Sequence, residues 1–586
     1  MSRTRRRFGQ RGARPVNPAL ERALEACASE RIHLSAAIQP HGYLITCQLP
    51  DWTIHHVSAN IEALLGAPVQ EMLRSSLREF LTDDLIQAIA ETIGFSEPGA
   101  PPQRAAVSNI GPMAHLCDVS VHIADSLVHI EIEPQLRSAG ERSPTVVAQT
   151  MIARVANSAD IVDFNQRVAE QVRQLTGYDR VMVYRFRHDD AGEVVAESRA
   201  SELPAYLGLR YPASDIPVQA RALYLRNRIR VIPDARYVPV PIVPERDTRG
   251  QPLDLSQHAL RSVSPVHLEY LANMGVVASM SISIISGGRL WGLIACHHRS
   301  PRRVPPGVRA AADLFGLFVS MRVASREQQQ AAALEEEARN VRDALALRLD
   351  NASEPRLALT AELDLLVRAI DCDGVGLLQG GHWYSAGRAP DGSFVPGLLG
   401  WLQGCNAATG PVSTDHAEEW AGTVDAADGL AGVLALPLDL GRDEWVFFFR
   451  CEQVDEVRWA GSPDEPFLLT EDGTRIGPRA SFAAWHETVR GVSAPWTDAD
   501  RRIAGRLHLM LRERYRRGSL PDLGDIRAQG TRLDVRSQRD RLQQLSELLD
   551  GMVHVSPQDA AQLSDRIDRL ESDLQGLIDN AVVEED

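Results

Sequence analysis

The stretch Tyr211-Pro-Ala-Ser-Asp-Ile-Pro217 holds an aspartate in a turn between two prolines. Proline fixes its own φ angle and restricts the residue before it, so Pro212 and Pro217 limit how far this turn can move. Asp215 then offers hydrogen-bond acceptors from a stiff backbone. An aspartate in such a turn also serves as an ordinary helix cap, and this stretch taken alone favours that simpler role.

The chain contains no lysine among its 586 residues, and its net charge is −16. A P-loop and a protein kinase both need a lysine beside the nucleotide phosphates, and pyridoxal phosphate needs a side-chain amine. These classes are excluded, as is a Schiff base to any side chain. The seven cysteines are scattered without a Cys-x-x-Cys pair, so neither a disulfide framework nor a zinc cluster is expected, and no metal site is predicted.

The length predicts about three to five domains, at roughly 100–200 residues each. No apolar run reaches the roughly 18 residues of a membrane span, and the arginine-rich start lacks the apolar block of a secretory signal. A cytoplasmic protein without a membrane segment is expected. Residues 1–17 are expected to form a disordered basic arm, and nucleic-acid contact is the less favoured alternative on an acidic chain.

Strand and helix patterns predict a multidomain α+β fold. A first α+β block runs from Pro18 to about Ser138, a second contains the elements from about Asp160 to Arg299, and a third runs from about Ser353 to Gly518. A helix from Pro305 to about Asp350 is long enough to couple two domains. The turn Ser286-Gly287-Gly288 predicts a hairpin, because glycine adopts positive φ without steric cost.

Three segments stand outside these patterns. Val231–Asp254 is proline-rich and too long for an ordinary connection, which indicates a function. Glu456–Ser493 lacks a regular pattern and is interpreted as a long excursion from the third block. Residues 519–586 carry seven arginines and fifteen acids, with apolar residues in heptads. That tail predicts an α-helical hairpin or a dimeric coiled coil, and packing on its own chain remains an equal alternative.

Four more stretches complete the pattern begun by Tyr211–Pro217. They are Cys27-Ala-Ser-Glu-Arg-Ile-His-Leu-Ser-Ala-Ala-Ile-Gln-Pro-His-Gly42, Arg261-Ser-Val-Ser-Pro-Val-His-Leu-Glu-Tyr-Leu-Ala-Asn-Met-Gly275, Leu290-Trp-Gly-Leu-Ile-Ala-Cys-His-His298 and Gly477-Pro-Arg-Ala-Ser-Phe482. In this order they closely resemble the photosensory core of bacterial phytochromes, over residues from about 20 to 515.

The resemblance implies three domains in series, linked by long helices. A PAS domain would occupy residues 18–138, a GAF domain that binds the chromophore 139–325, and a PHY domain 326–518 with a tongue at about 456–493. The tail 519–586 would be a helical output or dimerisation module. In this family the N-terminal segment passes through a lasso of the GAF domain, and the proline-rich stretch stands at the position of that lasso.

A bilin carries pyrrole N–H donors along one edge and two propionates along another, so its pocket needs an acceptor, cations and an apolar wall. The resemblance assigns the acceptor to Asp215 and the two pocket histidines to His267 and His297. Histidine suits these positions because its proton shifts near neutral pH. Any one of these residues considered singly is more simply a packing or surface residue. The remaining matches are Arg230 and Arg261 as propionate clamps with Tyr224 beside them, Tyr184, Tyr211 and Tyr270 around the rotating ring, and Ser279 and Ser281 near a propionate.

The resemblance also suggests how the bilin is attached. Phytochromes with more reduced bilins attach them through a cysteine directly before the pocket histidine, and that position here is Val266. Cys27 is the remaining candidate, which implies biliverdin IXα in a thioether link. Ser35-Ala36 replaces the Pro-Gly that is usual in the family, and this departure is expected to loosen the segment locally.

The implied function is red/far-red light reception, with bilin isomerisation followed by refolding of the tongue. The tongue would reach Asp215 through Arg479 or alternatively Ser481. A homodimer and an unidentified protein partner are expected, without nucleic acid, and no complete kinase or cyclase signature predicts an enzyme. The alternatives are a light-regulated histidine kinase that is truncated or completed in trans, and a GAF small-molecule sensor without photochemistry.

Overall fold

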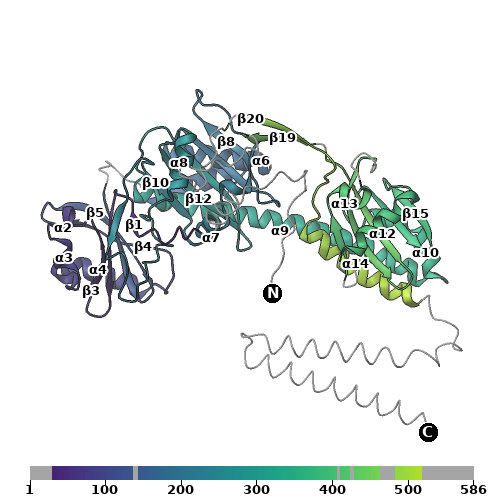
Figure 1. Cartoon of the computed structure of the whole chain (residues 1–586), viewed down its shortest axis with the longest axis horizontal. Coiled ribbons are helices and arrows are strands. Elements are labelled where there is room, and N and C mark those ends of the chain that lie inside the picture. Colours follow the sequence, from purple (N-terminus) through teal and green to yellow (C-terminus); the bar gives the residue numbers. More distant parts are fainter. Residues whose placement is uncertain are drawn as a thin grey trace, which may run out of the picture. The chain divides into compact units, whose positions relative to one another are not determined.

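The computed structural model describes residues 30–135, 143–405, 410–422, 428–453, 455–461, 482 and 484–517 (Figure 1). These residues form three β-sheets with covering helices, which confirms the predicted α+β class. The basic arm, Cys27, Arg479, Ser481 and the acidic tail lie outside the described residues. Among the helices that the structure describes, none combines the length and apolarity needed to cross a membrane.

The first domain is built on a seven-stranded antiparallel sheet in the order β1-β11-β3-β2-β6-β5-β4. Helix α4 covers it with Leu85, Ile86, Ile89 and Ile93, a helical spacing that puts these side chains on one face. The strands are β1 (Ala37–Ile38), β2 (Tyr43–Gln48), β3 (Thr53–Ser58), β4 (Gln103–Ile110), β5 (His115–Ala124), β6 (Leu127–Pro134) and β11 (Val240–Val243). The helices are α2 (Glu62–Leu65), α3 (Val69–Met72), η1 (Leu77–Glu79) and α4 (Asp83–Gly94).

One strand of this sheet comes from a distant part of the chain. Strand β11 lies in the proline-rich stretch and pairs with both β1 and β3. On the other side of β1, Gln39 N–H donates to the Leu260 carbonyl at 2.7 Å and Ser262 N–H donates to the Ala37 carbonyl at 2.9 Å. The N-terminal segment therefore lies between β11 on one side and residues 260–262 on the other. Both stretches follow β10 in the sequence, as the resemblance to the lasso implied.

The second domain contains an eight-stranded sheet in the order β10-β12-β13-β7-β8-β9-β19-β20. The predicted hairpin is confirmed: Ser286 pairs with Arg289, and Gly287 and Gly288 have φ angles of 56° and 72°. The strands are β7 (Arg180–Phe186), β8 (Gly192–Arg199), β9 (Leu209–Tyr211), β10 (Ile229–Ile232), β12 (Ala278–Ser286), β13 (Arg289–His298), β19 (Asp455–Ala460) and β20 (Ala484–Val489). The helices are α5 (Pro144–Val155), α6 (Ile161–Thr176), η2 (Ala213–Asp215), α7 (Val218–Arg226) and α8 (Pro265–Asn273).

The last two strands of this sheet belong to the excursion from the third block. Although the sequence of Glu456–Ser493 is poor in regular pattern, β19 and β20 pair with each other and β19 runs parallel to β9. The pairing partner of β19 lies about 250 residues earlier in the sequence, so no local pattern indicated it. Arg458 adds a hydrogen bond from its guanidinium to the Leu207 carbonyl at 3.0 Å.

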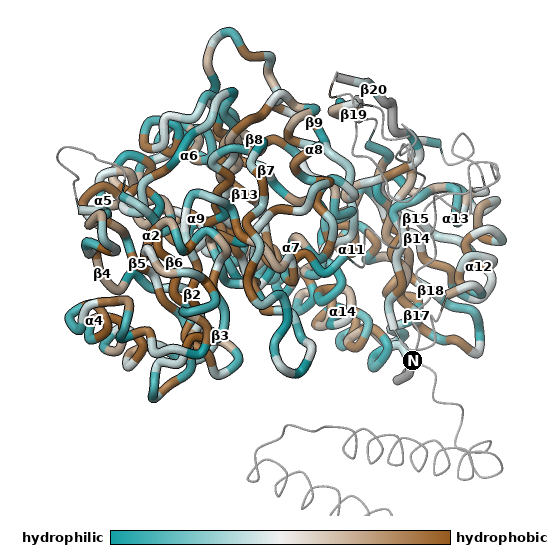
Figure 2. The backbone as a smooth tube through the Cα atoms, turned by 60° about the vertical axis from the view of Figure 1, so that its left-hand side comes forward, coloured by the Kyte–Doolittle hydropathy of each residue, from teal (hydrophilic) through white to brown (hydrophobic). Residues whose placement is uncertain are grey.

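The third domain has a five-stranded antiparallel sheet in the order β15-β14-β18-β17-β16. Its centre is apolar, and Figure 2 shows brown, hydrophobic backbone along β18, where Phe447, Phe448 and Phe449 are fully buried. The strands are β14 (Gly374–Gln379), β15 (His382–Gly387), β16 (Val412–Thr414), β17 (Leu430–Asp439) and β18 (Glu444–Cys451). The helices are α10 (Pro355–Ala361), α11 (Leu363–Val367), η3 (Gly392–Phe394), α12 (Val395–Gln403) and α13 (Ala417–Ala421).

Two helices connect and close these blocks. Helix α9 (Pro306–Asp350) spans 45 residues and confirms the predicted long helix. Helix α14 (Asp498–Arg517) begins with a capping box: Thr497 N–H donates to the Asp500 carboxylate at 2.7 Å, and Asp500 N–H donates to the Thr497 hydroxyl at 3.1 Å. These reciprocal bonds fix where α14 starts.

The N-terminal segment contains one strained residue that allows a test. Ala36 has φ of 48°, in the left-handed region that glycine prefers, and it stands where the resembling family has glycine. A left-handed alanine destabilises the folded state by roughly 1–2 kcal/mol. Glycine removes this cost, but it gives the unfolded chain more conformational entropy, which lowers stability by about 0.4–1 kcal/mol. Ala36→Gly is therefore expected to raise the free energy of unfolding by about 0.5–1 kcal/mol in urea titrations.

Ala37→Gly, in strand β1 beside it, is the matched control and is expected to lower the free energy of unfolding. A loss of stability in Ala36→Gly would contradict this interpretation.

Candidate functional site

The second domain encloses a cavity of about 330 Å³. Eleven of the twelve residues predicted to bind the cofactor line its wall, and the twelfth, Cys27, lies outside the described residues. The eleven are Tyr184, Tyr211, Asp215, Tyr224, Arg230, Arg261, His267, Tyr270, Ser279, Ser281 and His297. The structure thus brings together, from nine elements or connections, side chains that the sequence spreads over 114 positions.

Regular secondary structure places many of these side chains. Ser264 and Pro265 begin α8, since proline suits the first turn of a helix. His267, Tyr270, Leu271 and Met274 then face the cavity, at the i, i+3, i+4, i+7 spacing of one helix face.

The strands contribute by alternation. On β12, Ser279 and Ser281 line the cavity, and on β13 Leu293, Ala295 and His297 do so. Residues two apart on a strand point to the same face of a sheet, so each strand presents one row of side chains. The same alternation puts Met182 and Tyr184 of β7 into the wall.

Asp215 takes part in a polar and aromatic group at one end of the cavity. The Tyr270 hydroxyl donates to its Oδ2 at 3.0 Å. The rings of Tyr270 and His267 stack with centroids 6.1 Å apart, and Phe482 meets Tyr270 edge-on at 5.1 Å. Phe482 closes the predicted Gly477–Phe482 motif, so the end of that motif contacts the cavity wall through Tyr270.

Two arginines provide positive charge in the wall. Arg230 is 8% exposed and donates to the carbonyls of Ala259 and Arg261, while Arg261 is 8% exposed and donates to the Ile32 carbonyl at 3.0 Å. Burial, and after it the neighbouring Arg230, lower the pKa of Arg261 to about 9, so it stays charged at neutral pH. Within the described ranges neither guanidinium has a carboxylate at ion-pair distance, and Arg261 Nε has no hydrogen-bond partner. A buried cation without a counter-charge is costly, which points to an anion at this place.

The two pocket histidines are held neutral. Burial, followed by the charges of Arg230 and Arg261, lowers the pKa of His267 to about 4. Burial, followed by Arg180, lowers the pKa of His297 to about 3. His297 Nδ1 and the Tyr211 hydroxyl are buried without hydrogen-bond partners in the part of the chain that the structure describes. These polar atoms in an otherwise apolar cavity are where a polar ligand edge would bind.

The beginning of the described chain approaches the same cavity. Glu30 and Ile32 line it, and the Ser264 hydroxyl lies 3.1 Å from the Glu30 carboxylate. Val266, which stands in the alternative cysteine position, also lines the wall. The switch candidates Arg479 and Ser481 are outside the described residues, and their predicted roles stay predictions.

Sequence reasoning missed much of the apolar wall. Met182, Val194, Leu223, Val263, Met274 and Leu293 line the cavity and were not singled out. Apolar residues on strands and helices are ordinary core residues by composition, so nothing in their type indicates a ligand. Steps of two residues along a strand lead from Tyr184 to Met182 and from His297 to Leu293. A step of four residues along α8 leads from Tyr270 to Met274, so these three could have been predicted from the periodicity.

The burial of His297 predicts how acid acts on the chain without chromophore. Its folded-state pKa lies below the unfolded value of about 6.5, so the unfolded chain takes up the proton first as the pH falls. The stabilising effect of the neutral ring is complete above pH 6.5 and is lost progressively as the pH falls from 6.5 towards about 3. His297→Gln is expected to reduce the slope of unfolding free energy against pH in this window by up to one proton, about 1.4 kcal/mol per pH unit.

The measurement is urea unfolding at several pH values from 7 to 4. His382→Gln, at an exposed position of β15, is the matched control. Equal slopes for wild type and His297→Gln would contradict the buried, neutral state of this ring.

Comparisons with known proteins agree with this arrangement. Family models described as PAS fold, GAF domain and phytochrome region match residues 27–135, 160–323 and 338–519. A bacteriophytochrome of Pseudomonas aeruginosa is 40% identical over 501 residues, which cover 84% of this chain and 66% of that protein. A bacteriophytochrome of Xanthomonas campestris pv. campestris is 34% identical over 516 residues, which cover 84% of this chain and 79% of that protein.

A solved structure shows the same likeness in three dimensions. The crystal structure of a bacteriophytochrome from the photosynthetic bacterium R. palustris has a TM-score of 0.73 and 33% sequence identity, and the match covers 85% of this chain and all of that one. The chain spans just under two thirds of the Pseudomonas protein. With three family models in series and these relatives, the chain belongs to the phytochrome family and contains the PAS, GAF and PHY domains of a bacteriophytochrome photosensory core.

Proposed function

We propose that this chain is a red/far-red light photoreceptor that holds a bilin in the cavity of its second domain. The observation that carries the proposal is the pair of buried arginines, Arg230 and Arg261, which face an apolar cavity without a carboxylate partner among the described residues. A bilin brings two propionates and a row of N–H donors to one apolar body. The cavity offers two cations for the former and acceptors at Asp215 for the latter, so its residues fit this class of cofactor.

Each polar wall residue has a distinct task in this proposal. Arg230 and Arg261 bind the propionates, and a planar guanidinium suits a carboxylate because it donates two parallel hydrogen bonds. Ser279 and Ser281 lie on β12, where Ser281 is directly opposite Arg230 on β10. Their hydroxyls therefore supply donors next to one of the cations. Asp215 accepts hydrogen bonds at the pyrrole edge.

The aromatic and histidine residues shape the other end. Tyr184 and Tyr211 lie with ring centroids 5.8 Å apart, and both are buried. His297 also lines the cavity, and its Nδ1, which has no hydrogen-bond partner among the described residues, would bind a carbonyl or donor of the ligand. The bound bilin supplies the absorption of red light and the double-bond isomerisation. The wall residues then determine which of two arrangements is stable.

We propose biliverdin IXα as the bilin, attached through Cys27. Val266 lines the cavity directly before His267, and a valine cannot form a thioether. Glu30 also lines the cavity, and Cys27 precedes it by three residues, a distance that the chain spans in at most about 10–11 Å. A thiol on so short a tether reaches the wall beside Arg261.

We propose that the signal leaves the cavity through β9. This strand ends at Tyr211, precedes Asp215 by one turn and pairs with β19 of the tongue. Phe482 contacts Tyr270, whose hydroxyl is bonded to Asp215. A change at Asp215 therefore acts on the tongue along two routes, which supports refolding of the tongue as the switch, with Arg479 or Ser481 as its link to Asp215.

We propose a homodimer with a protein partner as the output arrangement. Leu314, Leu317 and Met321 of α9 are 42%, 42% and 60% exposed. Their i, i+3, i+7 spacing places them on one helix face, which suits a helix of a second copy. The predicted helical tail, residues 519–586, would continue this association and contact the partner.

The first prediction from this proposal concerns covalent attachment. Coexpression of the chain with a biliverdin source is expected to give a coloured protein whose colour remains with the polypeptide after denaturation. Cys27→Ser is expected to lose this retained colour, because the thioether sulfur is gone, while Cys405→Ser serves as a control distant in sequence. A colourless wild type would refute the proposed function, and a Cys27→Ser variant with fully retained colour would refute the attachment site alone.

The second prediction concerns the tongue. Arg479→Ala is expected to keep bilin binding, since the cavity wall is unchanged, but to lower the population of the photoproduct about tenfold or more, as loss of a hydrogen bond to a charged group costs roughly 1.5–3 kcal/mol. Absorption spectra after red illumination measure that population. Arg490→Ala, at an exposed position just after β20, is the control. A photoproduct yield equal to that of wild type would show that Arg479 is not the link.

A further inference from the structure

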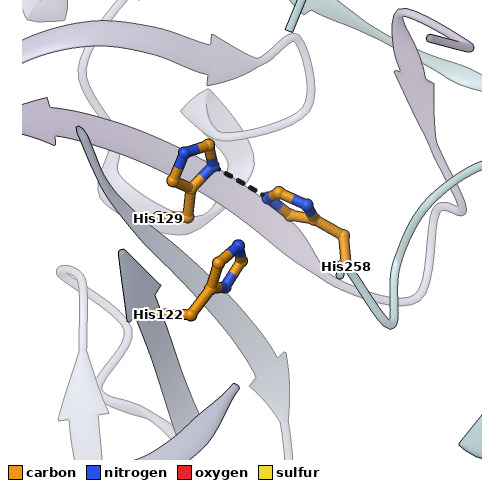
Figure 3. Close-up of side chains that lie close together, drawn as sticks. All are labelled: His122, His129 and His258. Atoms are coloured by element: carbon orange, nitrogen blue, oxygen red, sulfur yellow. Dashed lines mark hydrogen bonds between the residues drawn. The ribbon is translucent and has the colours of Figure 1, made fainter. Parts of the chain in front are cut away.

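Three buried histidines form a group outside the cavity, at the junction of the first domain with the lasso. His122 lies on β5 and His129 on the neighbouring β6, where the two residues are directly opposite. His258 comes from the segment between β11 and α8. Figure 3 shows the three imidazoles turned toward one another, with His258 approaching from the far side. All three are at most 2% exposed.

The ring nitrogens are close enough to share one ion. One nitrogen from each ring lies within 4.8 Å of the other two, and His129 Nδ1 is 3.1 Å from His258 Nε2. In a tetrahedral zinc site with bonds of about 2.0–2.1 Å, two ligand nitrogens are roughly 3.3 Å apart. Two of the rings already have this spacing, and a shift of about 1.5 Å by His122 would complete the set.

The hydrogen bonds around the rings leave lone pairs at the centre. The Ala124 carbonyl is 3.2 Å from His129 Nε2, so this nitrogen carries the proton and Nδ1 presents its lone pair inward. Such a carbonyl behind a histidine is the usual support of a metal ligand.

The hydrogen bond between His129 and His258 satisfies one nitrogen of each of these two rings but none of His122. It leaves both nitrogens of His122 without a partner among the residues that the structure describes. A fully buried imidazole without hydrogen bonds is costly. The ring of His122 stacks on His129 with centroids 4.7 Å apart and meets His258 at a steep angle, with centroids 4.6 Å apart.

We propose that His122, His129 and His258 bind one divalent transition-metal ion, with zinc as the best match, and that this ion links the first domain's sheet to the lasso. Three imidazoles with a fourth position for water are a common zinc set. On binding, the proton between His129 and His258 moves to His258 Nδ1, so both rings stay neutral and no proton has to leave. Cysteine spacing gave no sign of this site, because its three ligands are histidines from two distant segments.

The position suggests what the ion would do. Directly after His258, the N–H groups of Ala259 and Leu260 donate to the Glu131 carboxylate at 3.2 and 2.7 Å. Arg261 follows in the cavity wall. An ion at the histidines would therefore fix the lasso three residues before a cavity residue, and it would hold the first and second domains together independently of light reception.

The test uses the full chain with bound bilin, expressed with added zinc and dialysed against metal-free buffer. Elemental analysis by mass spectrometry is expected to give about one zinc per chain for wild type. His122→Gln and His258→Gln are expected to lower this at least tenfold, while His115→Gln, exposed on the same strand as His122, is expected to keep it. The bilin absorption spectrum verifies that each variant is folded.

Thermal unfolding of wild type with and without zinc is a second test, and it does not depend on how well the variants fold. Wild type is expected to melt several degrees lower after removal of zinc with EDTA and to recover when zinc is returned. Less than about 0.1 zinc per wild-type chain after loading, or an unchanged melting temperature, would overturn the proposal. An equal loss of bound zinc in His115→Gln and His122→Gln would also overturn the proposal.

Discussion

The cavity depends on a short backbone ladder that holds the N-terminal segment against the lasso. Gln39 and Ala37 bond to Leu260 and Ser262, and the Gln39 side chain reaches the Val231 carbonyl at 3.0 Å. This one crossing fixes Arg261 between them. It also brings Ile32 to the cavity wall, where its carbonyl accepts a hydrogen bond from Arg261.

The second constraint is electrostatic. Among the described residues, Arg230 and Arg261 have only carbonyl oxygens as hydrogen-bond partners, and burial keeps His267 and His297 neutral. The positive charge is therefore confined to one region of the cavity, while the opposite end is aromatic. A ligand with anionic groups on one side and a conjugated apolar body on the other fits this separation. The strand pairing of β9 with β19 then connects the same cavity to the third domain's tongue.

The sequence predicted local features well, because their causes are local. The Ser286–Gly288 hairpin and the long helix α9 both follow from residue types a few positions apart. Eleven residues singled out through motifs shared with a family line one cavity, and their roles toward a cofactor stay predictions. The apolar wall was missed, since Met182 and Leu293 look like any core residue. The pairing of β19 with β9 and the histidine group were missed because long-range contacts have no local pattern.

The proposed function requires reversible photochemistry of the bound bilin. Absorption spectra of the full chain assembled with biliverdin, recorded after alternating red and far-red illumination, test this requirement. Two interconvertible spectra are expected, because Asp215, His297 and the tongue would support two arrangements of one bound bilin. A bound bilin whose spectrum does not change under either colour of light would contradict it.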